Sequence, residues 1–255
     1  MTSFSGILQS FQPISLNEMD EVELMNRVDK KYVFHSSLLP TLLSEFLPYY
    51  RILEIEGKRE FAYNTSYFDT ETCEMYHQHS QGKLNRQKLR LRLYEITGTS
   101  YLEVKINNNK GRTIKERIKT WGPTGTVIET EDFLREQVPF DIASLKPALY
   151  TFFKRITLVS GEFKERVTLD FDIRFEVPGG KAISLPYLSI AETKNDAHSH
   201  HTPMMDAMKK YHVLPMSFSK YCVGSALLND SFKKNTFKPQ LLKIEKLKNY
   251  TLQTN

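Results

Sequence analysis

The chain has 255 residues, of which 40% are hydrophobic and 25% charged, and a formal net charge of +5. This composition is typical of a soluble globular protein and excludes a largely disordered chain. No apolar run reaches the roughly 18 residues that a membrane-spanning helix needs, and the N-terminus lacks the features of a signal peptide. We therefore expect a cytoplasmic protein without a transmembrane segment. Cys73 and Cys222 fit no metal-binding spacing and are expected to be free thiols.

Hydrophobic periodicity and capping residues predict the secondary structure. Helices are expected to begin where a capping residue precedes an amphipathic stretch, as at Thr130, Thr202-Pro203 and Ser219. Strands are expected where polar and apolar residues alternate, and the many strands with added helices indicate an α+β fold. The first predicted elements are a loose polar arm over 1–13, a helix over 15–26, a strand over 27–34, a helix over 37–47, a strand over 63–68 and a short helix ending at 79. Strands over 87–96, 100–106 and 112–120 follow, and then helices over 130–138 and 147–154. The chain continues with strands over 155–159, 164–177 and 187–195, helices over 203–211 and 220–228, and a Lys-rich tail that is solvated or weakly helical.

The predicted strand at 87–96 is the most informative segment. Lys88, Arg90 and Arg92 fall on one side of its two-residue period, and three leucines fall on the other. Like charges on one face of a strand repel each other, so an anionic group is expected to lie against them.

Charged faces recur along the chain. For any single strand, a solvated surface of mixed charge is the ordinary interpretation, but several such strands in one chain favour a shared function. If they close into a barrel with the apolar face outward under the helices, the interior becomes a basic tunnel that binds anions strongly. The other residues that share charged strand faces are Arg27, Asp29 and Lys31; Glu103 and Lys105; Lys115, Arg117 and Lys119; Arg166, Asp170, Asp172 and Arg174; Glu192 and Lys194.

Short motifs between Asn26 and Leu228, taken together in their order and spacing, resemble the VTC-type polyphosphate polymerase domain. This domain belongs to the CYTH, or triphosphate tunnel metalloenzyme, superfamily. The motifs are Lys31-Tyr32, Tyr67-Phe68-Asp69-Thr70, Lys88-x-Arg90-x-Arg92-x-Tyr94, Leu102-Glu103-Val104-Lys105, Lys115-Glu116-Arg117, Arg155, Arg166-x-x-x-Asp170, Glu192-Thr193-Lys194 and Ser219-Lys220-Tyr221.

The resemblance implies an antiparallel tunnel of about eight strands with a basic interior and helices packed outside. It divides the chain into an N-terminal arm over 1–25, a catalytic domain over 26–228 and a Lys-rich tail over 229–255. It implies a metal-dependent phosphotransferase that moves the terminal phosphate of a nucleoside triphosphate, with ATP favoured, onto polyphosphate.

The expected site follows from the same resemblance and from the chemistry of the residues. The expected catalytic residues are Arg90, Arg92, Lys105, Arg155 and Lys220. The expected phosphate-binding residues are Lys31, Lys88, Lys115, Arg117, Arg166, Lys194 and Ser219. Glu192 is expected to bind Mn²⁺ or Mg²⁺, with Asp29 and Glu103 as further candidates; Glu103 is equally compatible with a partner role for Lys105. Asp170 and Asp172 are expected to orient Arg166 and Arg174 through ion pairs.

Two alternatives stay open, a metal-dependent inorganic triphosphatase and a non-catalytic polyanion-binding module. Hydrolytic tunnel enzymes carry Glu-x-Glu-x-Lys where this chain reads Arg27-x-Asp29-x-Lys31, and the missing carboxylate favours transfer over hydrolysis. Nucleic acid is not expected as a ligand, because a closed channel excludes a duplex and no base-stacking aromatic motif stands beside the basic residues. The sequence does not identify a membrane partner or an oligomeric state.

Overall fold

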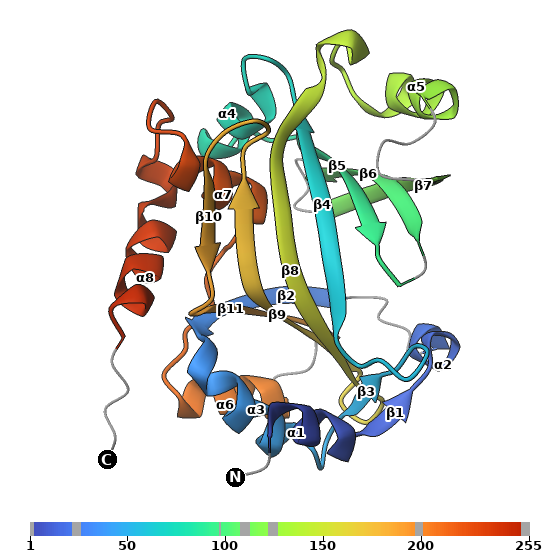
Figure 1. Ribbon diagram of the computed structural model, residues 1–255, viewed down its shortest axis with the longest axis vertical. Coiled ribbons are helices and arrows are strands. Elements are labelled where there is room, and N and C mark those ends of the chain that lie inside the picture. Colours follow the sequence, from blue (N-terminus) through green and yellow to red (C-terminus); the bar gives the residue numbers. More distant parts are fainter. Residues whose placement is uncertain are drawn as a thin grey trace.

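The computed structural model describes residues 3–21, 27–96, 98–107, 113–121, 127–196 and 201–250. Eleven strands form one sheet, antiparallel except where the short β1 pairs with β3. The main path through the sheet runs β2-β11-β9-β8-β4-β5-β6-β7 (Figure 1). The strands are β1 (Gln12–Ile14), β2 (Arg27–His35), β3 (Arg51–Leu53), β4 (Phe61–Asp69), β5 (Arg86–Tyr94), β6 (Thr99–Asn107), β7 (Thr113–Trp121), β8 (Lys146–Ser160), β9 (Glu165–Glu176), β10 (Ala182–Leu185) and β11 (Leu188–Asp196).

The main path contains the eight antiparallel strands that the sequence predicts, and this architecture is confirmed. Closure is not. Within the described residues, β2 and β7 end the path without pairing to each other. One cavity is nevertheless lined from both of these strands, so the sheet is strongly curved. The expected closed barrel is therefore corrected to an open, curved sheet.

Helices pack against the sheet in two groups, with α1, α3 and α6 at one end and α4, α7 and α8 at the other (Figure 1). The first group covers buried residues of β8 and β9 such as Ile156 and Leu169. The second shares a core cluster with β4, β5, β8 and β9. The helices are α1 (Phe4–Ser10), α2 (Leu16–Glu21), α3 (Leu39–Phe46), α4 (Glu74–Ser80), α5 (Val127–Gln137), α6 (Pro203–Lys210), α7 (Lys220–Leu228) and α8 (Lys238–Lys248), with 3₁₀ turns η1 (Ser36–Leu38), η2 (Ile142–Ser144) and η3 (Asn235–Phe237).

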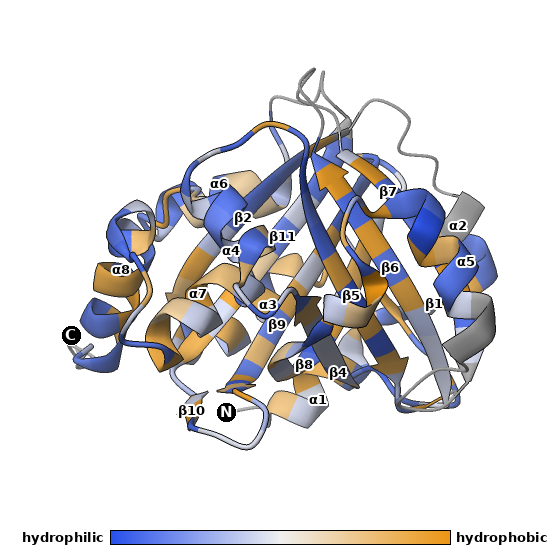
Figure 2. Ribbon diagram, turned by 90° about the horizontal axis from the view of Figure 1, so that it is seen from above, coloured by the Kyte–Doolittle hydropathy of each residue, from blue (hydrophilic) through white to orange (hydrophobic). Residues whose placement is uncertain are grey.

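Alternation along the strands separates an apolar from a polar face, as the colour bands along β5 and β6 show (Figure 2). Leu89 and Leu91 of β5 are buried in one core cluster with Leu102 of β6 and Leu134 of α5. Because successive strand residues point to opposite faces, the basic residues of β5 are turned away from this core. The predicted strand over 87–96 is confirmed as far as Tyr94, where β5 ends.

Two predicted elements are wrong in type or extent. Residues 147–154 were expected to be helical, but they belong to the long strand β8, which pairs with both β4 and β9. Neighbours on both edges satisfy the backbone of this segment, and pairing of that kind overrides local helix propensity. Helix α5 begins at Val127, before the expected cap at Thr130. The helices that follow Thr202 and Ser219 begin as predicted, and each side chain accepts a backbone hydrogen bond from its helix.

Both ends of the chain are more ordered than predicted. The expected loose arm over 1–13 contains α1 and β1, and Ile7 and Leu8 are buried in the cluster with α3. The tail, which was expected to be solvated or weakly helical, contains the helix α8, whose Ile244 and Leu247 are buried in the larger core cluster. Apolar residues at helical spacing thus anchor the Lys-rich segment despite its charge. The second half of the predicted helix at 15–26 lies outside the described residues. No helix in the described ranges has the length and apolar character to cross a membrane.

Gly224 of α7 provides a test of this packing. A Cβ atom at this position would lie 2.8 Å from the side chains of Leu149 and Phe175. We expect Gly224→Ala to lower the free energy of unfolding by about 1–2 kcal/mol, because overpacking outweighs the gain in helix propensity. Urea denaturation measures the change. Gly161→Ala is the matched control, since a Cβ there meets nothing within 4 Å, and equal stability of the two variants would contradict this packing.

Candidate active site

A cavity of about 220 Å³ lies on the polar face of the sheet. We call it the basic cavity, because nine basic side chains and two carboxylates line it. Its walls come from β2, β4, β5, β6, β7, β8, β11 and the start of α7. Twelve predicted site residues line it, namely Asp29, Lys31, Lys88, Arg90, Arg92, Lys105, Lys115, Arg155, Glu192, Lys194, Ser219 and Lys220. The strand order thus gathers residues that are spread over most of the sequence.

Three lysines stand side by side across three neighbouring strands. Lys88 of β5 is directly opposite Lys105 of β6, and Lys105 is directly opposite Lys115 of β7. We call these residues the lysine row. Directly opposed like charges destabilise a sheet. Burial, reinforced by neighbouring cations that include Lys31, lowers the pKa of both Lys88 and Lys105 to about 8. The row is therefore suited to an anion that neutralises it.

Glu103 is the counter-ion in the next row. Its side chain is 1% exposed, Arg90 Nε donates to it over 2.6 Å, and Lys115 forms an ion pair with it. Burial alone would raise the pKa of Glu103, but Arg90, Arg92 and Lys115 outweigh burial and lower it to about 2. Glu103 does not line the basic cavity, and its partners are Arg90 and Lys115 in place of the expected Lys105.

Asp170 of β9 is a buried acid that pairs with two further cations of the cavity. Arg155 donates to its carboxylate through Nε at 2.5 Å and Nη2 at 2.8 Å, and Lys220 forms an ion pair with the same group. Burial would raise the pKa of Asp170, but Arg155 and Lys220 outweigh it and lower the pKa below its usual range. A buried bidentate pair sets the orientation of a guanidinium. Asp170 therefore positions Arg155 and Lys220.

The expected partners of the β9 aspartates are wrong. Arg166 donates to the backbone carbonyl of Met19 over 2.8 Å and does not line the basic cavity. Asp172 has a positive φ beside a register shift, and it forms an ion pair with Lys154 at 3.9 Å. Arg174 pairs with Glu176 on the exposed surface. The shift breaks the simple alternation from which these pairs were inferred.

Arg117 also lies outside the cavity lining. Its guanidinium lies over the ring of Tyr101, 5.0 Å from the ring centroid. It shares a cross-strand row with Arg90 and Glu103, and its side chain is exposed. Phosphate binding by Arg117 or Arg166 therefore has no support from the lining of this cavity.

Two carboxylates of the basic cavity could contribute to a metal site. Glu192 of β11 lies 3.8 Å from Lys31 and 3.7 Å from Lys194. Burial would raise its pKa, but these cations and Arg155 lower it to about 2, so the group is ionised at neutral pH. Asp29 lies across the β2–β11 ladder, opposite Lys194. Among the described residues, no group of three or more His, Cys, Asp or Glu side chains could hold an ion. One or two carboxylates with phosphate oxygens suit Mg²⁺, and this donor set fits that chemistry.

Five lining residues are absent from the predicted site: Tyr67, Thr113, Phe153, Ile190 and Phe218. Tyr67 faces Arg90 across β4 and β5. Burial would raise the pKa of Tyr67, but Arg90, Lys220 and Arg92 lower it overall. The ammonium of Lys220 lies over the ring of Phe153, 4.3 Å from the ring centroid. Such a cation–π contact stabilises a desolvated cation. The sequence shows the strand alternation of Tyr63, Thr65 and Tyr67. It does not show the pairing register between β4 and β5 that places Tyr67 beside the cations.

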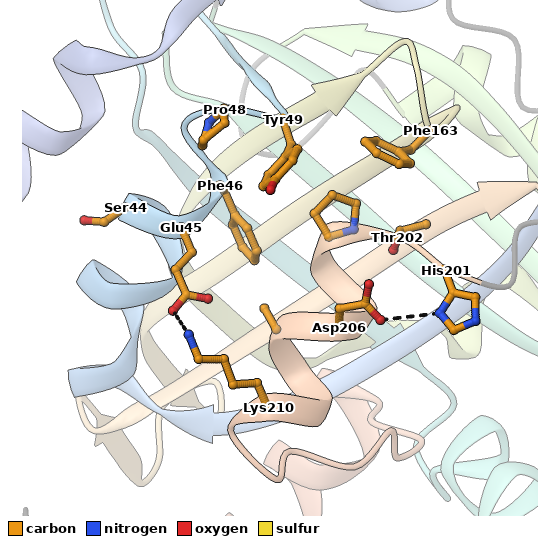
Figure 3. A pocket seen from close by; sticks show the side chains of 12 residues that line it. Ser44, Glu45, Phe46, Pro48, Tyr49, Phe163, His201, Thr202, Asp206 and Lys210 are labelled. Atoms are coloured by element: carbon orange, nitrogen blue, oxygen red, sulfur yellow. Dashed lines mark hydrogen bonds and ion pairs between the residues drawn. The ribbon is translucent and has the colours of Figure 1, made fainter.

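The larger hollow between α3 and α6, about 510 Å³, differs in character (Figure 3). Its polar groups pair with each other: Lys210 forms an ion pair with Glu45 at 2.6 Å, and the His201 ring lies 3.5 Å from the Asp206 carboxylate. Aromatic side chains such as Tyr49 and Phe163 form much of the remaining wall. Because its charges are mutually satisfied, this hollow lacks the excess of cations that marks the basic cavity.

The fold is thus a curved antiparallel sheet that gathers basic side chains on its polar face. The VTC domain model matches residues 26–229. The chain therefore belongs to the VTC domain family, and the resemblance noted from its motifs is confirmed.

Solved structures show weaker similarity. A proposed adenylate cyclase of Bacillus halodurans is 14% identical, with a TM-score of 0.49, covering 76% of this chain and 94% of that chain. A proposed adenylyl cyclase of Hippeastrum, described as having a dominant triphosphatase activity, is 13% identical, with a TM-score of 0.46, covering 81% and 98%. The PH1819 protein of Pyrococcus horikoshii is 10% identical, with a TM-score of 0.46, covering 78% and 96%. No curated protein matches the chain. The family assignment rests on the domain match.

The buried Glu103 predicts a specific pH dependence of stability. Its folded-state pKa of about 2 lies below the ordinary 4.5, so its contribution is present above pH 4.5 and is lost as the pH falls toward 2. We expect Glu103→Gln to cost about 3 kcal/mol at pH 7, because Arg90 and Lys115 lose their partner, and to flatten the acid limb of the stability curve. Urea unfolding at several pH values measures both effects.

The control is Glu71→Gln, because the Glu71–Lys146 ion pair is exposed and contributes little. A Glu103→Gln variant whose stability and acid limb match those of the Glu71→Gln control would show that Glu103 does not stabilise the cations.

Proposed function

We propose that this protein is a polyphosphate polymerase that transfers the terminal phosphate of ATP, or of another nucleoside triphosphate, onto a growing polyphosphate chain. The lysine row beside Arg90 and Arg92 is the observation that carries the proposal. Membership of the VTC domain family supports it. Polyphosphate offers no base or sugar to recognise, so repeated cationic contacts in a cavity are the recognition it requires.

Phosphoryl transfer depends mainly on positioning and on stabilisation of developing charge. In the proposed reaction, Arg90, Arg92 and Arg155 orient phosphate oxygens through their two-pronged guanidinium groups, whereas the lysines act as point charges. Arg92 Nε is buried and has no hydrogen-bond partner among the described residues, which suits such a contact. Ser219 and Lys220 present the N-terminus of α7 to the cavity, where helix N–H groups favour an anion.

Glu192 and Asp29 would hold a Mn²⁺ or Mg²⁺ ion together with phosphate oxygens. When bound, such an ion neutralises charge between neighbouring phosphates. The nearby Lys31 and Lys194 keep Glu192 ionised and therefore ready to act as a ligand. Loss of Glu192 is expected to affect metal-dependent turnover more than phosphate binding.

An inorganic triphosphatase is the second candidate. The same two carboxylates favour it, because an ionised Glu192 or Asp29 that lines the cavity could orient a water molecule toward a bound phosphate. The two activities differ in product. Hydrolysis releases orthophosphate from tripolyphosphate, whereas polymerisation lengthens a chain. A protein that binds polyphosphate without turnover would instead be a polyanion-binding module.

Incubation with ATP and Mn²⁺, followed by gel analysis of chain length, tests the proposal. We expect wild-type protein to produce chains, and Arg90→Ala or Arg92→Ala to lower the rate about 100-fold or more by removing charge stabilisation at the phosphates. Arg174→Ala is the control, because Arg174 is an exposed arginine that pairs with Glu176.

Orthophosphate release without elongation would favour the triphosphatase. Normal elongation by both Arg90→Ala and Arg92→Ala, with folding verified by thermal unfolding, would contradict the assignment of the basic cavity as the active site.

A further inference from the structure

A smaller cavity of about 130 Å³ adjoins the basic cavity and shares three of its wall residues. We call it the mouth. It is lined by His79, Arg86, Lys88, Lys105, Asn107 and Thr113. Lys88, Lys105 and Thr113 belong to both cavities, so the two spaces meet at the lysine row. Neither His79 nor Arg86 belongs to the site predicted from the sequence.

The strand register makes the mouth a continuation of the cationic face. Arg86, Asn107 and Thr113 are opposite one another across β5, β6 and β7, one row beyond the lysine row. Residues two apart on a strand share a face and lie about 6.6–6.8 Å apart along it. The rows headed by Arg86, Lys88, Arg90 and Arg92 therefore form a ladder of cations along one edge of the polar face, and the ladder extends past the basic cavity.

His79 and Arg86 are held in one arrangement. Arg86 Nε donates to His79 Nδ1 over 3.3 Å, and Arg86 Nη1 donates to the carbonyl of Lys83 over 3.1 Å. The ring of His79 stacks on Phe237 at a centroid distance of 5.8 Å. Burial, with Lys88 and Arg86 nearby, lowers the pKa of His79 to about 3. A neutral ring that accepts at Nδ1 carries its proton on Nε2, so His79 supplies a neutral donor beside the Arg86 guanidinium.

We propose that the mouth binds a phosphate group of a linear polyphosphate whose neighbouring phosphates occupy the basic cavity. The proposal rests on the proposed function for the class of ligand, and it adds the direction in which the chain leaves. The described residues that line the mouth supply cations, an amide, a hydroxyl and an imidazole, and none of them is an aliphatic residue. Such a lining matches phosphate oxygens better than the flat apolar surface of a nucleoside base.

Chain-length dependence of affinity tests the proposal. Dissociation constants for tripolyphosphate and for long-chain polyphosphate are measured by calorimetry with wild-type protein and Arg86→Met. A charge-assisted contact at the mouth predicts about tenfold weaker binding of the long chain by the variant. Binding of tripolyphosphate, which the basic cavity holds, is expected to change by less than about twofold. The matched control is Lys83→Met, an exposed lysine outside both cavities.

A second variant keeps the test decisive if Arg86→Met does not fold. Asn107→Asp adds a negative charge to the mouth without removing the Arg86–His79 contact, and it should also weaken the long chain more than tripolyphosphate. Equal loss for both ligands, or no loss for either, in variants with wild-type thermal unfolding would overturn the proposal.

If wild-type protein elongates chains but the mouth variants bind normally, only the mouth proposal fails. If the variants show the chain-length effect but the protein does not elongate chains, the mouth proposal holds and the polymerase proposal fails.

Discussion

Mutual repulsion among cations on one face of a curved sheet is the constraint on which this structure depends. The lysine row places three lysines in directly opposed register positions on adjacent strands. Burial lowers the pKa values of Lys88 and Lys105, and repulsion from nearby cations such as Lys31 and Arg90 adds to this effect. We expect such an arrangement to cost stability in the free protein and a bound polyanion to remove that cost. The proposed polyanion therefore accounts for the basic cavity better than folding stability does.

The fold tolerates this charge because buried carboxylates pair with several of the cations that line the cavity. Glu103 balances Arg90 and Lys115, and Asp170 balances Arg155 and Lys220. Both acids are almost inaccessible to solvent, and both have lowered pKa values. Each fixes cations in place without occupying the space in which a ligand binds. In this site, buried acids position the basic side chains, and the basic side chains that line the cavity are the proposed phosphate-binding groups.

The sequence predicted the local pattern well and the long-range pairing poorly. The alternation at Lys88, Arg90 and Arg92 depends only on the two-residue period of a strand, and it was correct. The partner of Asp170 depends on which strand lies beside β9, and the sequence pattern pointed to Arg166 where the structure has Arg155. The mouth contact of His79 was likewise beyond prediction, because it joins α4 to β5 across a turn. The helix predicted over 147–154 failed because pairing on both edges of β8 decides its conformation.

Substitution of the central lysine of the row tests the central claim most directly. Lys105→Met keeps most of the length of the side chain and removes its charge. Chemical denaturation at low ionic strength, with and without tripolyphosphate, gives the free energy of unfolding in both states. If repulsion shapes the site, the variant is more stable than wild type without ligand and gains less stability when tripolyphosphate is added. A variant that is less stable without ligand, and that gains as much from tripolyphosphate as wild type does, would contradict this account.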